Sequence, residues 1–180
     1  MNIERALATE GWMMESELVY LAEMALRSRS IAEVGSWMGR STCALAVNCP
    51  GCVMAFDTWE GSAEHQPMLA EKPNSWLVSE FLRNTHGLPV VAVQGKSTVR
   101  AAEMAESKRR FDLIFLDASH DYDNVKADIL AWTPLLTDGG ILCGHDYDPP
   151  HWMGVKQAVD EFVPKFRIVP GTTIWTTEAV

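Results

Sequence analysis

The chain has few basic residues: 15 lysines and arginines face 24 aspartates and glutamates, which leaves a formal net charge of -9. This charge repels a phosphate backbone, so no nucleic-acid partner is expected. The sequence also lacks a run of about 18 apolar residues that could span a membrane, and a basic and then apolar leader at its start. We therefore expect a soluble, unprocessed cytoplasmic protein with no membrane contact, for which a homo-oligomer is allowed.

Cysteine is also scarce, with four residues in the chain. Only Cys49 and Cys52 lie close together, and neither a second such pair nor a nearby pair of histidines completes a zinc site. Pro50 and Gly51 between them favour a turn that enters a strand, with a redox pair as the less favoured alternative. The length of 180 residues and the 47% of hydrophobic residues suit one domain over residues 1–180.

Apolar periodicity predicts the order of the elements. An amphipathic helix is expected over residues 15–28, in an N-terminal helical segment at 1–29. Five short apolar runs follow, at 30–34, 53–57, 89–93, 111–117 and 140–144. Helical stretches lie between them, at 41–48, 76–85, 97–106 and 124–136. Continuous apolar strands that alternate with helices are typical of parallel strands covered on both faces, so we predict a doubly wound, Rossmann-like α/β sheet.

The C-terminus departs from this alternation. A helix at 155–162 precedes two runs, 166–169 and 172–176, which a Pro-Gly pair separates. This pattern predicts an antiparallel hairpin at the edge of the sheet. The one long irregular connection, residues 60–75, is a candidate lid over a ligand because long loops in compact domains are commonly functional.

The residues that follow the predicted strands point to a ligand with a ribose. In an open parallel sheet, ligands bind beyond the carboxyl ends of the strands, where this chain places Asp57, Asp117 and Asp146. A dinucleotide is the first alternative, because Asp57 follows Gly35 by 22 residues. However, Trp37 stands where G-x-G-x-x-G has its second glycine, and its bulk would obstruct a pyrophosphate. S-adenosylmethionine, which has a ribose and no pyrophosphate, suits the pattern better.

Several segments together carry a family resemblance. They are Gly11-Trp12-Met13, EVGSWMGRST at 33–42, FDTWEGS at 56–62, FDLIFLDASHDYDNVKADI from 111, GGILCGHDY from 139 and GVKQAVDEF from 154. In this order they resemble the class I S-adenosylmethionine-dependent methyltransferases, in a compact branch similar to small-molecule O-methyltransferases for sugar or phenol hydroxyls. The resemblance implies a mostly parallel, seven-stranded sheet that ends in an antiparallel hairpin.

The resemblance also implies which residues bind the cofactor. They are Glu33, Gly35, Ser36, Trp37, Gly39, Ser41, Thr42, Asp57, Trp59, Gly95, Ser97 and Asp117. Among them, Asp57 would contact the ribose hydroxyls and Trp59 would lie near the adenosine. The alternatives stay open: Asp57 as a capping or turn acid, and both tryptophans as packing residues.

A second cluster resembles the site of metal-dependent O-methyltransferases. Asp117, His145 and Asp146 match positions that hold a divalent cation there, and a histidine ligand admits manganese beside magnesium. His120 matches the position of the base that takes the proton from a substrate hydroxyl, with Asp117 beside it as the second catalytic residue. The alternative for His120 is a hydrogen bond within its own turn.

Other residues near these loops have simpler interpretations. Asp121 and Asp123 are expected to cap or charge the start of the next helix. His65, His151 and Trp152 are candidate substrate contacts, with solvated loop residues as the favoured alternative.

The sequence thus predicts an S-adenosylmethionine-dependent O-methyltransferase for a small hydroxyl compound, with a divalent cation allowed and not required. One alternative is a catalytically silent S-adenosylmethionine-binding module that serves a partner. The other is an oxidoreductase with a nucleotide cofactor of the NAD type, which Trp37 disfavours.

Overall fold

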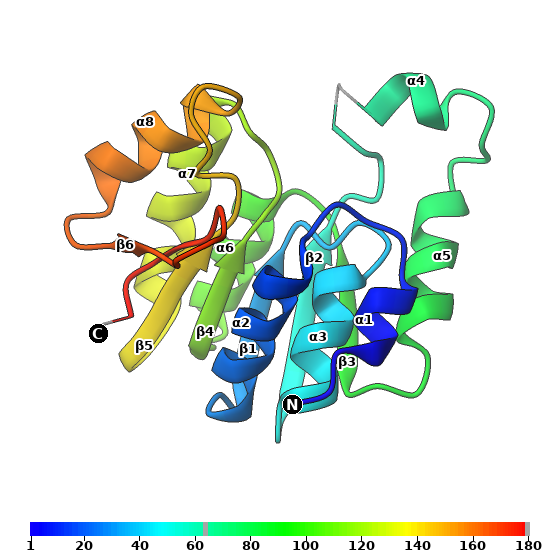
Figure 1. Cartoon of the computed structure of the whole chain (residues 1–180), viewed down its shortest axis with the longest axis horizontal. Coiled ribbons are helices and arrows are strands. Elements are labelled where there is room, and N and C mark those ends of the chain that lie inside the picture. The colour runs from blue at the N-terminus through cyan, green and yellow to red at the C-terminus, as the bar shows by residue number, and fades with distance from the viewer. Residues whose placement is uncertain (63–64, 179–180) are drawn as a thin grey trace.

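The computed structural model describes residues 1–62 and 65–178. Within them one sheet has the strand order β3-β2-β1-β4-β5-β7-β6 (Figure 1). The first five strands are parallel, and β7 runs antiparallel to both β5 and β6. The strands are β1 Ser30–Val34, β2 Cys52–Asp57, β3 Val90–Gln94, β4 Phe111–Leu116, β5 Leu136–Gly144, β6 Arg167–Ile168 and β7 Trp175–Thr176. The predicted doubly wound sheet with an antiparallel C-terminal hairpin is confirmed.

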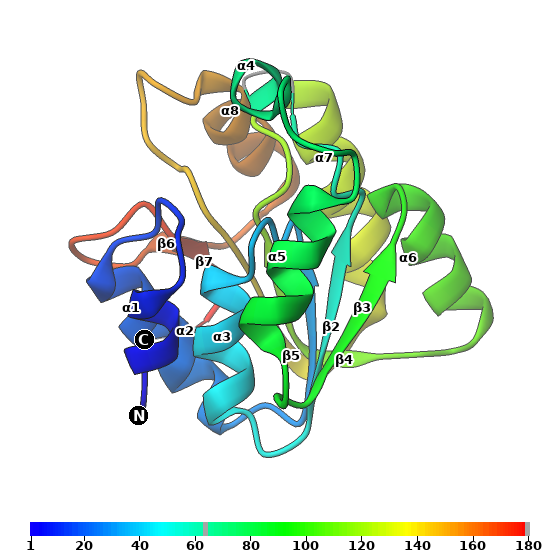
Figure 2. The same cartoon turned by 90° about the vertical axis from the view of Figure 1, so that its right-hand side faces the viewer.

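Helices cover both faces of this sheet (Figure 2). One face carries α1 Glu4–Ala8, α2 Glu15–Leu26, α3 Arg40–Asn48 and α5 Trp76–Thr85. The other carries α6 Ser97–Glu106, α7 Tyr122–Trp132 and α8 Met153–Phe162. The short helix α4, Gln66–Leu69, stands off the body of the domain above α5 (Figure 1). No helix in the described ranges is long and apolar enough to cross a membrane.

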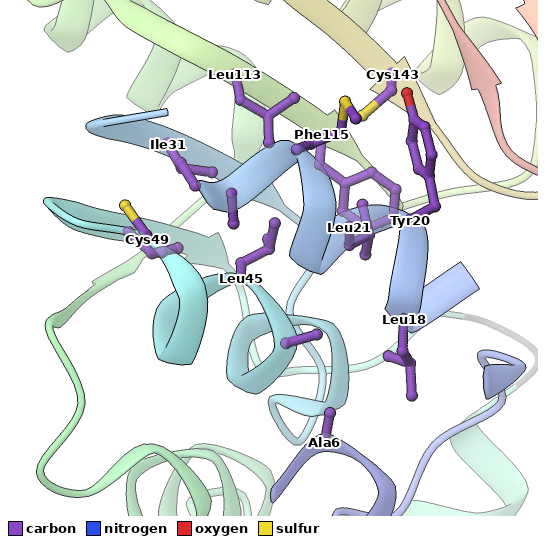
Figure 3. Close-up of a cluster of buried hydrophobic side chains, with 14 of the residues drawn as sticks. Ala6, Leu18, Tyr20, Leu21, Ile31, Leu45, Cys49, Leu113, Phe115 and Cys143 are labelled. Atoms are coloured by element: carbon purple, nitrogen blue, oxygen red, sulfur yellow. The ribbon is translucent and has the colours of Figure 1, made fainter. Parts of the chain in front are cut away.

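The strands alternate their side chains between two apolar cores because successive strand residues point to opposite faces. Ile31 of β1 and Leu113 of β4 join Leu18 and Leu21 of α2 and Leu45 of α3 in one core (Figure 3). Their neighbours along the strands join Trp132 and the helices of the other face. Both faces of the central strands are therefore buried, which explains why these strands are continuously apolar in sequence.

Some of the predicted bounds need correction. The helix expected to reach residue 136 ends at Trp132, and a 3-10 turn at Thr133–Leu135 leads into β5. Pro134 explains this end, because proline lacks the N–H that a helix interior needs. The strand expected at 140–144 begins earlier, at Leu136. Helix α1 lies in the predicted N-terminal helical segment, but its bounds were not predicted, and α4 was not predicted, because four or five residues are too few to display a helical period.

Candidate active site

A cavity of about 730 Å³ opens where the strand order reverses, between β1 and β4. Open parallel sheets bind ligands at this point, because the loops that leave the two strands diverge to opposite faces. The cavity collects loops that follow all five parallel strands. Many predicted site residues line it: Gly35, Ser36, Trp37, Ser41, Asp57, Gly95, Ser97, Asp117, His120, His145 and Asp146.

The glycine loop after β1 owes its course to a close backbone approach. Gly35 has a φ of +86°, and a Cβ atom there would lie 2.1 Å from the carbonyl oxygen of Asp117. Only glycine fits this contact, because any side chain would strain the backbone and collide with the end of β4. Trp37 also adopts a left-handed conformation, with a φ of +48°, so the loop turns twice before α3 begins.

Asp57 holds that loop in place. Its Oδ2 accepts hydrogen bonds from the backbone N–H of Ser36 and Trp37 at 2.7 and 2.9 Å. Its Oδ1 accepts one from the N–H of Trp59 at 2.7 Å. The role as a turn acid is therefore present in the structure. Asp57 also lines the cavity, so a contact with a ribose is compatible with its position and stays a prediction.

Four predicted cofactor residues do not line the cavity. They are Glu33, Gly39, Thr42 and Trp59. Trp59 packs on Phe81 with ring centroids 4.9 Å apart, and its Nε1 donates to the carbonyl of Trp37 at 3.0 Å. Gly39 forms the N-cap of α3, close to Phe81. Trp59 and Gly39 thus support the glycine loop from the side that faces Phe81 and not the cavity.

Glu33 is fully buried beneath the loop. The hydroxyl of Thr42 donates to its Oε2, and its Oε1 has no hydrogen-bond partner. Burial raises the pKa of this carboxyl to about 7, and the nearby Asp117 acts in the same direction. An acid in such a position is poised between its two forms near neutral pH.

The second wall of the cavity is a network of acids and histidines after β4 and β5. Nε2 of His120 lies 2.9 Å from Oδ2 of Asp146. Nδ1 of His145 lies 3.2 Å from the same oxygen and 3.6 Å from Oδ1 of Asp117. The sequence prediction that these four residues gather at one edge of the sheet is therefore confirmed.

Glu17 of α2 completes this network, and it was not predicted as a site residue, because in the sequence it only marks the start of a helix. The residue is 1% exposed, and its Oε2 lies 2.9 Å from Nε2 of His145. Its Oε1 accepts hydrogen bonds from the N–H and hydroxyl of Thr173, both at 3.0 Å. One carboxylate thus joins the N-terminal helix, the C-terminal hairpin and the site.

The charges of the network shift the pKa values of its members in different directions, and burial raises the pKa of Asp117. Burial opposes a charge on His145, but Asp117, Asp146 and Glu17 together raise the pKa of its imidazole far above the usual value. Burial likewise opposes ionisation of Asp146, yet hydrogen bonds with His120 and His145 hold its pKa well below the ordinary range. These contacts favour the protonated form of His145.

The predicted metal ligands are brought together only in part. Asp117, His120 and Asp146 each offer an atom within 4.8 Å of the others, which is a spacing that suits one cation. The predicted ligand His145 is not in this group, because its two ring nitrogens face Glu17 on one side and the two aspartates on the other.

The mouth of the cavity is aromatic. Trp12, Trp37 and His65 pack against one another there, and Trp152 stacks on His120 with ring centroids 4.0 Å apart. Trp12 was not predicted as a site residue, although it lies in one of the matched segments. His151 does not line the cavity and pairs instead with Asp148 at 3.0 Å.

The candidate lid contributes to the mouth through the part that is described. Gly61, Ser62 and His65 line the cavity, while residues 63–64 of the predicted lid lie outside the described ranges. Asp121 caps α7 as predicted, because its Oδ1 accepts the N–H of Asn124 at 3.1 Å.

Comparisons with known proteins agree with this picture. A family model described as a methyltransferase domain matches residues 32–147. An uncharacterized Sinorhizobium fredii protein, y4gI, is 27% identical over 157 residues, and the match covers 82% of this chain and 16% of that protein's length. The chain thus corresponds to a small part of this curated relative.

Solved structures share the fold at low identity. CalS11, a TDP-rhamnose 3′-O-methyltransferase of calicheamicin biosynthesis, is 22% identical with a TM-score of 0.62, over 89% of this chain and 76% of that one. A Bacillus cereus O-methyltransferase in complex with SAH is 17% identical with a TM-score of 0.63, over 97% and 89%. A Staphylococcus aureus protein named as a caffeoyl-CoA O-methyltransferase is 15% identical with a TM-score of 0.66, over 98% and 90%.

Proposed function

Because the chain belongs to the methyltransferase domain family, we propose that it methylates a hydroxyl oxygen of a small molecule with S-adenosylmethionine as the donor. The observation that carries the proposal is the pair of His120 and Asp146, 2.9 Å apart in the cavity that the glycine loop borders. The similar O-methyltransferase structures support oxygen as the acceptor atom.

The glycine-loop half of the cavity fits the cofactor. Gly35 lines the cavity, and its lack of a side chain lets the loop pass close to the end of β4. The Oγ of Ser36 and the Nε1 of Trp37 are buried polar atoms without a hydrogen-bond partner. Such atoms are expected to find partners on a bound ligand. When bound, S-adenosylmethionine supplies an electrophilic methyl group on a positively charged sulfur. Asp57 and Asp117 give the cavity the negative charge that suits this cation.

The other half fits the acceptor. His120 takes the proton of the acceptor hydroxyl, and Asp146 orients its imidazole and stabilises the imidazolium that forms. Trp152 stacks on the imidazole and holds the plane of its ring. Transfer to oxygen is a single displacement, so the main task of the walls is to align the acceptor and to exclude water.

A divalent cation fits the same half. Asp117, His120 and Asp146 would hold it, and it would lower the pKa of a bound hydroxyl. Two aspartates with one histidine suit manganese better than magnesium, which prefers oxygen ligands.

The proposal also places the protein in the cytoplasm, where it would act on a small molecule. The net charge of -9 disfavours nucleic acids, and a homo-oligomer stays compatible with every contact described. The four cysteines are all unpaired, as is usual for proteins of a reducing compartment.

The test measures S-adenosylhomocysteine formed by the purified protein with hydroxyl, amine and carbon acceptors. We expect turnover with a hydroxyl compound, and a loss of at least about 100-fold in kcat for His120→Ala. His151→Ala is the matched control, because that exposed histidine lies outside the cavity, and it should stay within twofold of wild type. Methylation of amines or carbon alone would contradict the proposal.

Chelation separates the two roles open to His120. If a cation is required, EDTA abolishes turnover and Mn²⁺ restores it, while Asp117→Asn weakens Mn²⁺ binding measured by calorimetry. If EDTA changes nothing, His120 acts with Asp146 alone.

A further inference from the structure

The aromatic residues at the mouth form a defined surface, which we call the aromatic platform: Trp12, Trp37 and His65. Trp12 and His65 stack at 5.0 Å with an interplanar angle of 20°, and Trp37 lies 4.4 Å from His65 and 5.3 Å from Trp12. They come from three separate segments: the loop before α2, the glycine loop and the segment before α4. Three distant segments thus build one apolar surface on the cavity wall.

The indole of Trp12 is exposed to solvent and belongs to none of the hydrophobic core clusters of the described residues. It is 65% exposed, although an indole is among the most favourable side chains to bury. Trp12 lines the cavity and packs beside Trp37 and His65. The exposed ring at this place indicates that a ligand with an apolar face covers the platform.

The charges of the cavity limit what this ligand carries. Among the described lining residues the carboxylates are Asp57, Asp117, Asp128 and Asp146, and the Lys and Arg residues are Lys96 and Arg40. Arg40 donates its Nε to the carbonyl of Met13 at 3.0 Å and its Nη1 to that of Thr9 at 2.7 Å. Lys96 lies at the start of α6, beside the loop after β3. His145, the third basic group of the wall, is held between Glu17 and Asp146. Because Arg40 and His145 are both engaged in this way, a phosphate or carboxylate on the acceptor would find Lys96 as its cationic partner among the Lys, Arg and His145 side chains of the described wall.

We propose that the acceptor is an uncharged ring compound whose apolar ring face stacks on Trp12 of the aromatic platform. This inference rests on the proposed methyl transfer and adds the class of acceptor. A phenol and a sugar both offer such a face, one through its π system and the other through its C–H bonds. A phosphorylated or nucleotide-linked acceptor is expected to bind more weakly because of the same charges.

Two matched pairs of probes test the inference in the presence of saturating S-adenosylhomocysteine. Catechol is compared with 3,4-dihydroxybenzoate, and methyl α-D-glucopyranoside with glucose 1-phosphate, by saturation-transfer NMR titration. We expect an uncharged member to bind and its anionic counterpart to bind at least about tenfold more weakly. The pair that responds distinguishes a phenol from a sugar.

Variants then assign the binding to the platform. Trp12→Ala should weaken the uncharged probe about three- to tenfold, as expected for one lost stacking contact, and Trp12→Phe should restore most of it. Trp76→Ala is the control, because that tryptophan lies outside the cavity, beside Lys72. The affinity for S-adenosylhomocysteine, measured by calorimetry, should be unchanged in all three variants.

Each other outcome overturns the inference. It is wrong if the anionic probes bind as tightly as the uncharged ones, if neither pair binds, or if Trp12→Ala has no effect. A loss of S-adenosylhomocysteine affinity in Trp12→Ala would assign the platform to the cofactor instead. If wild type fails to bind S-adenosylhomocysteine at all, the proposed function itself falls, and the inference falls with it.

Discussion

The two halves of the cavity are held together by different means. The glycine-loop half depends on backbone geometry: the tight approach of Gly35 to β4, and the N–H groups of Ser36 and Trp37 that Asp57 accepts. The acid-histidine half depends on side-chain charge, with His145 fixed between Glu17 and the aspartates. The first half should therefore be sensitive to added atoms and the second to lost charge.

The largest effect is expected from the glycine loop. Gly35→Ala should lower the free energy of unfolding by about 4 kcal/mol or more, because the new Cβ would lie 2.1 Å from the Asp117 carbonyl. Gly87→Ala is the matched control, since Gly87 has a φ of +78° and nothing within 4 Å of a Cβ. It should lose only about 1 kcal/mol, which reports the left-handed backbone alone. Equal losses in urea denaturation would show that the contact with β4 is unimportant.

The acid-histidine half should respond nearly as strongly to a neutral substitution. Glu17→Gln should lower the free energy of unfolding by about 3 kcal/mol, because it leaves the buried His145 short of one counter-charge. The new amide would also turn a donor toward the N–H donors of Met14 or Thr173. Glu15→Gln, on the exposed side of the same helix, should change stability by less than about 0.5 kcal/mol. A similar result for both variants would argue against the network.

A buried acid of the cavity wall that belongs neither to the glycine loop nor to the acid-histidine network gives a pH-dependent prediction. Asp128 is 6% exposed, and burial raises the pKa of its carboxyl from 3.8 to about 6, against a hydrogen bond from Ser97. Its stabilising contribution is therefore complete below pH 3.8 and is lost as the pH rises through about 6.

Asp128→Asn should remove this dependence. The variant should be about 2 kcal/mol more stable than wild type at pH 8 and nearly equal to it at pH 4. Thermal unfolding across this range is the measurement, and Asp138→Asn, at an exposed position, is the control that should leave the profile unchanged. A stability gain that is the same at both pH values would contradict the assignment to Asp128.

The smallest effect on stability is expected from Asp57, and it separates a structural role of this acid from a role in cofactor binding. Asp57→Asn should lower the free energy of unfolding by about 1 kcal/mol and weaken S-adenosylhomocysteine binding about tenfold, because the loop loses charge-assisted hydrogen bonds. Asp112→Asn is the control, since Asp112 accepts the N–H groups of Arg29 and Ser30 outside the cavity. It should lose similar stability without a change in binding by calorimetry. Unchanged binding in Asp57→Asn would limit this acid to a structural role.

The sequence predicted the elements best where one signal dominates. Apolar runs located the five parallel strands, since strands buried on both faces need no polar alternation. It failed where a feature is short or depends on a neighbour, as for α1, α4 and the end of α7 at Trp132. Glu33 and Trp59 show the same limit in the site, because a position near the end of a strand does not tell whether a side chain faces the cavity or the core.

The sequence by itself determined which functional residues stand at the end of each strand. These are a glycine loop after β1, an acid at the end of β2, and acids and histidines after β4 and β5. These features depend on spacing along the chain, which local backbone preferences reveal. Only the tertiary structure joined Glu17 to His145 and Trp12 to Trp37. Such contacts link residues far apart in sequence, so they form only when the helices and loops pack against the sheet.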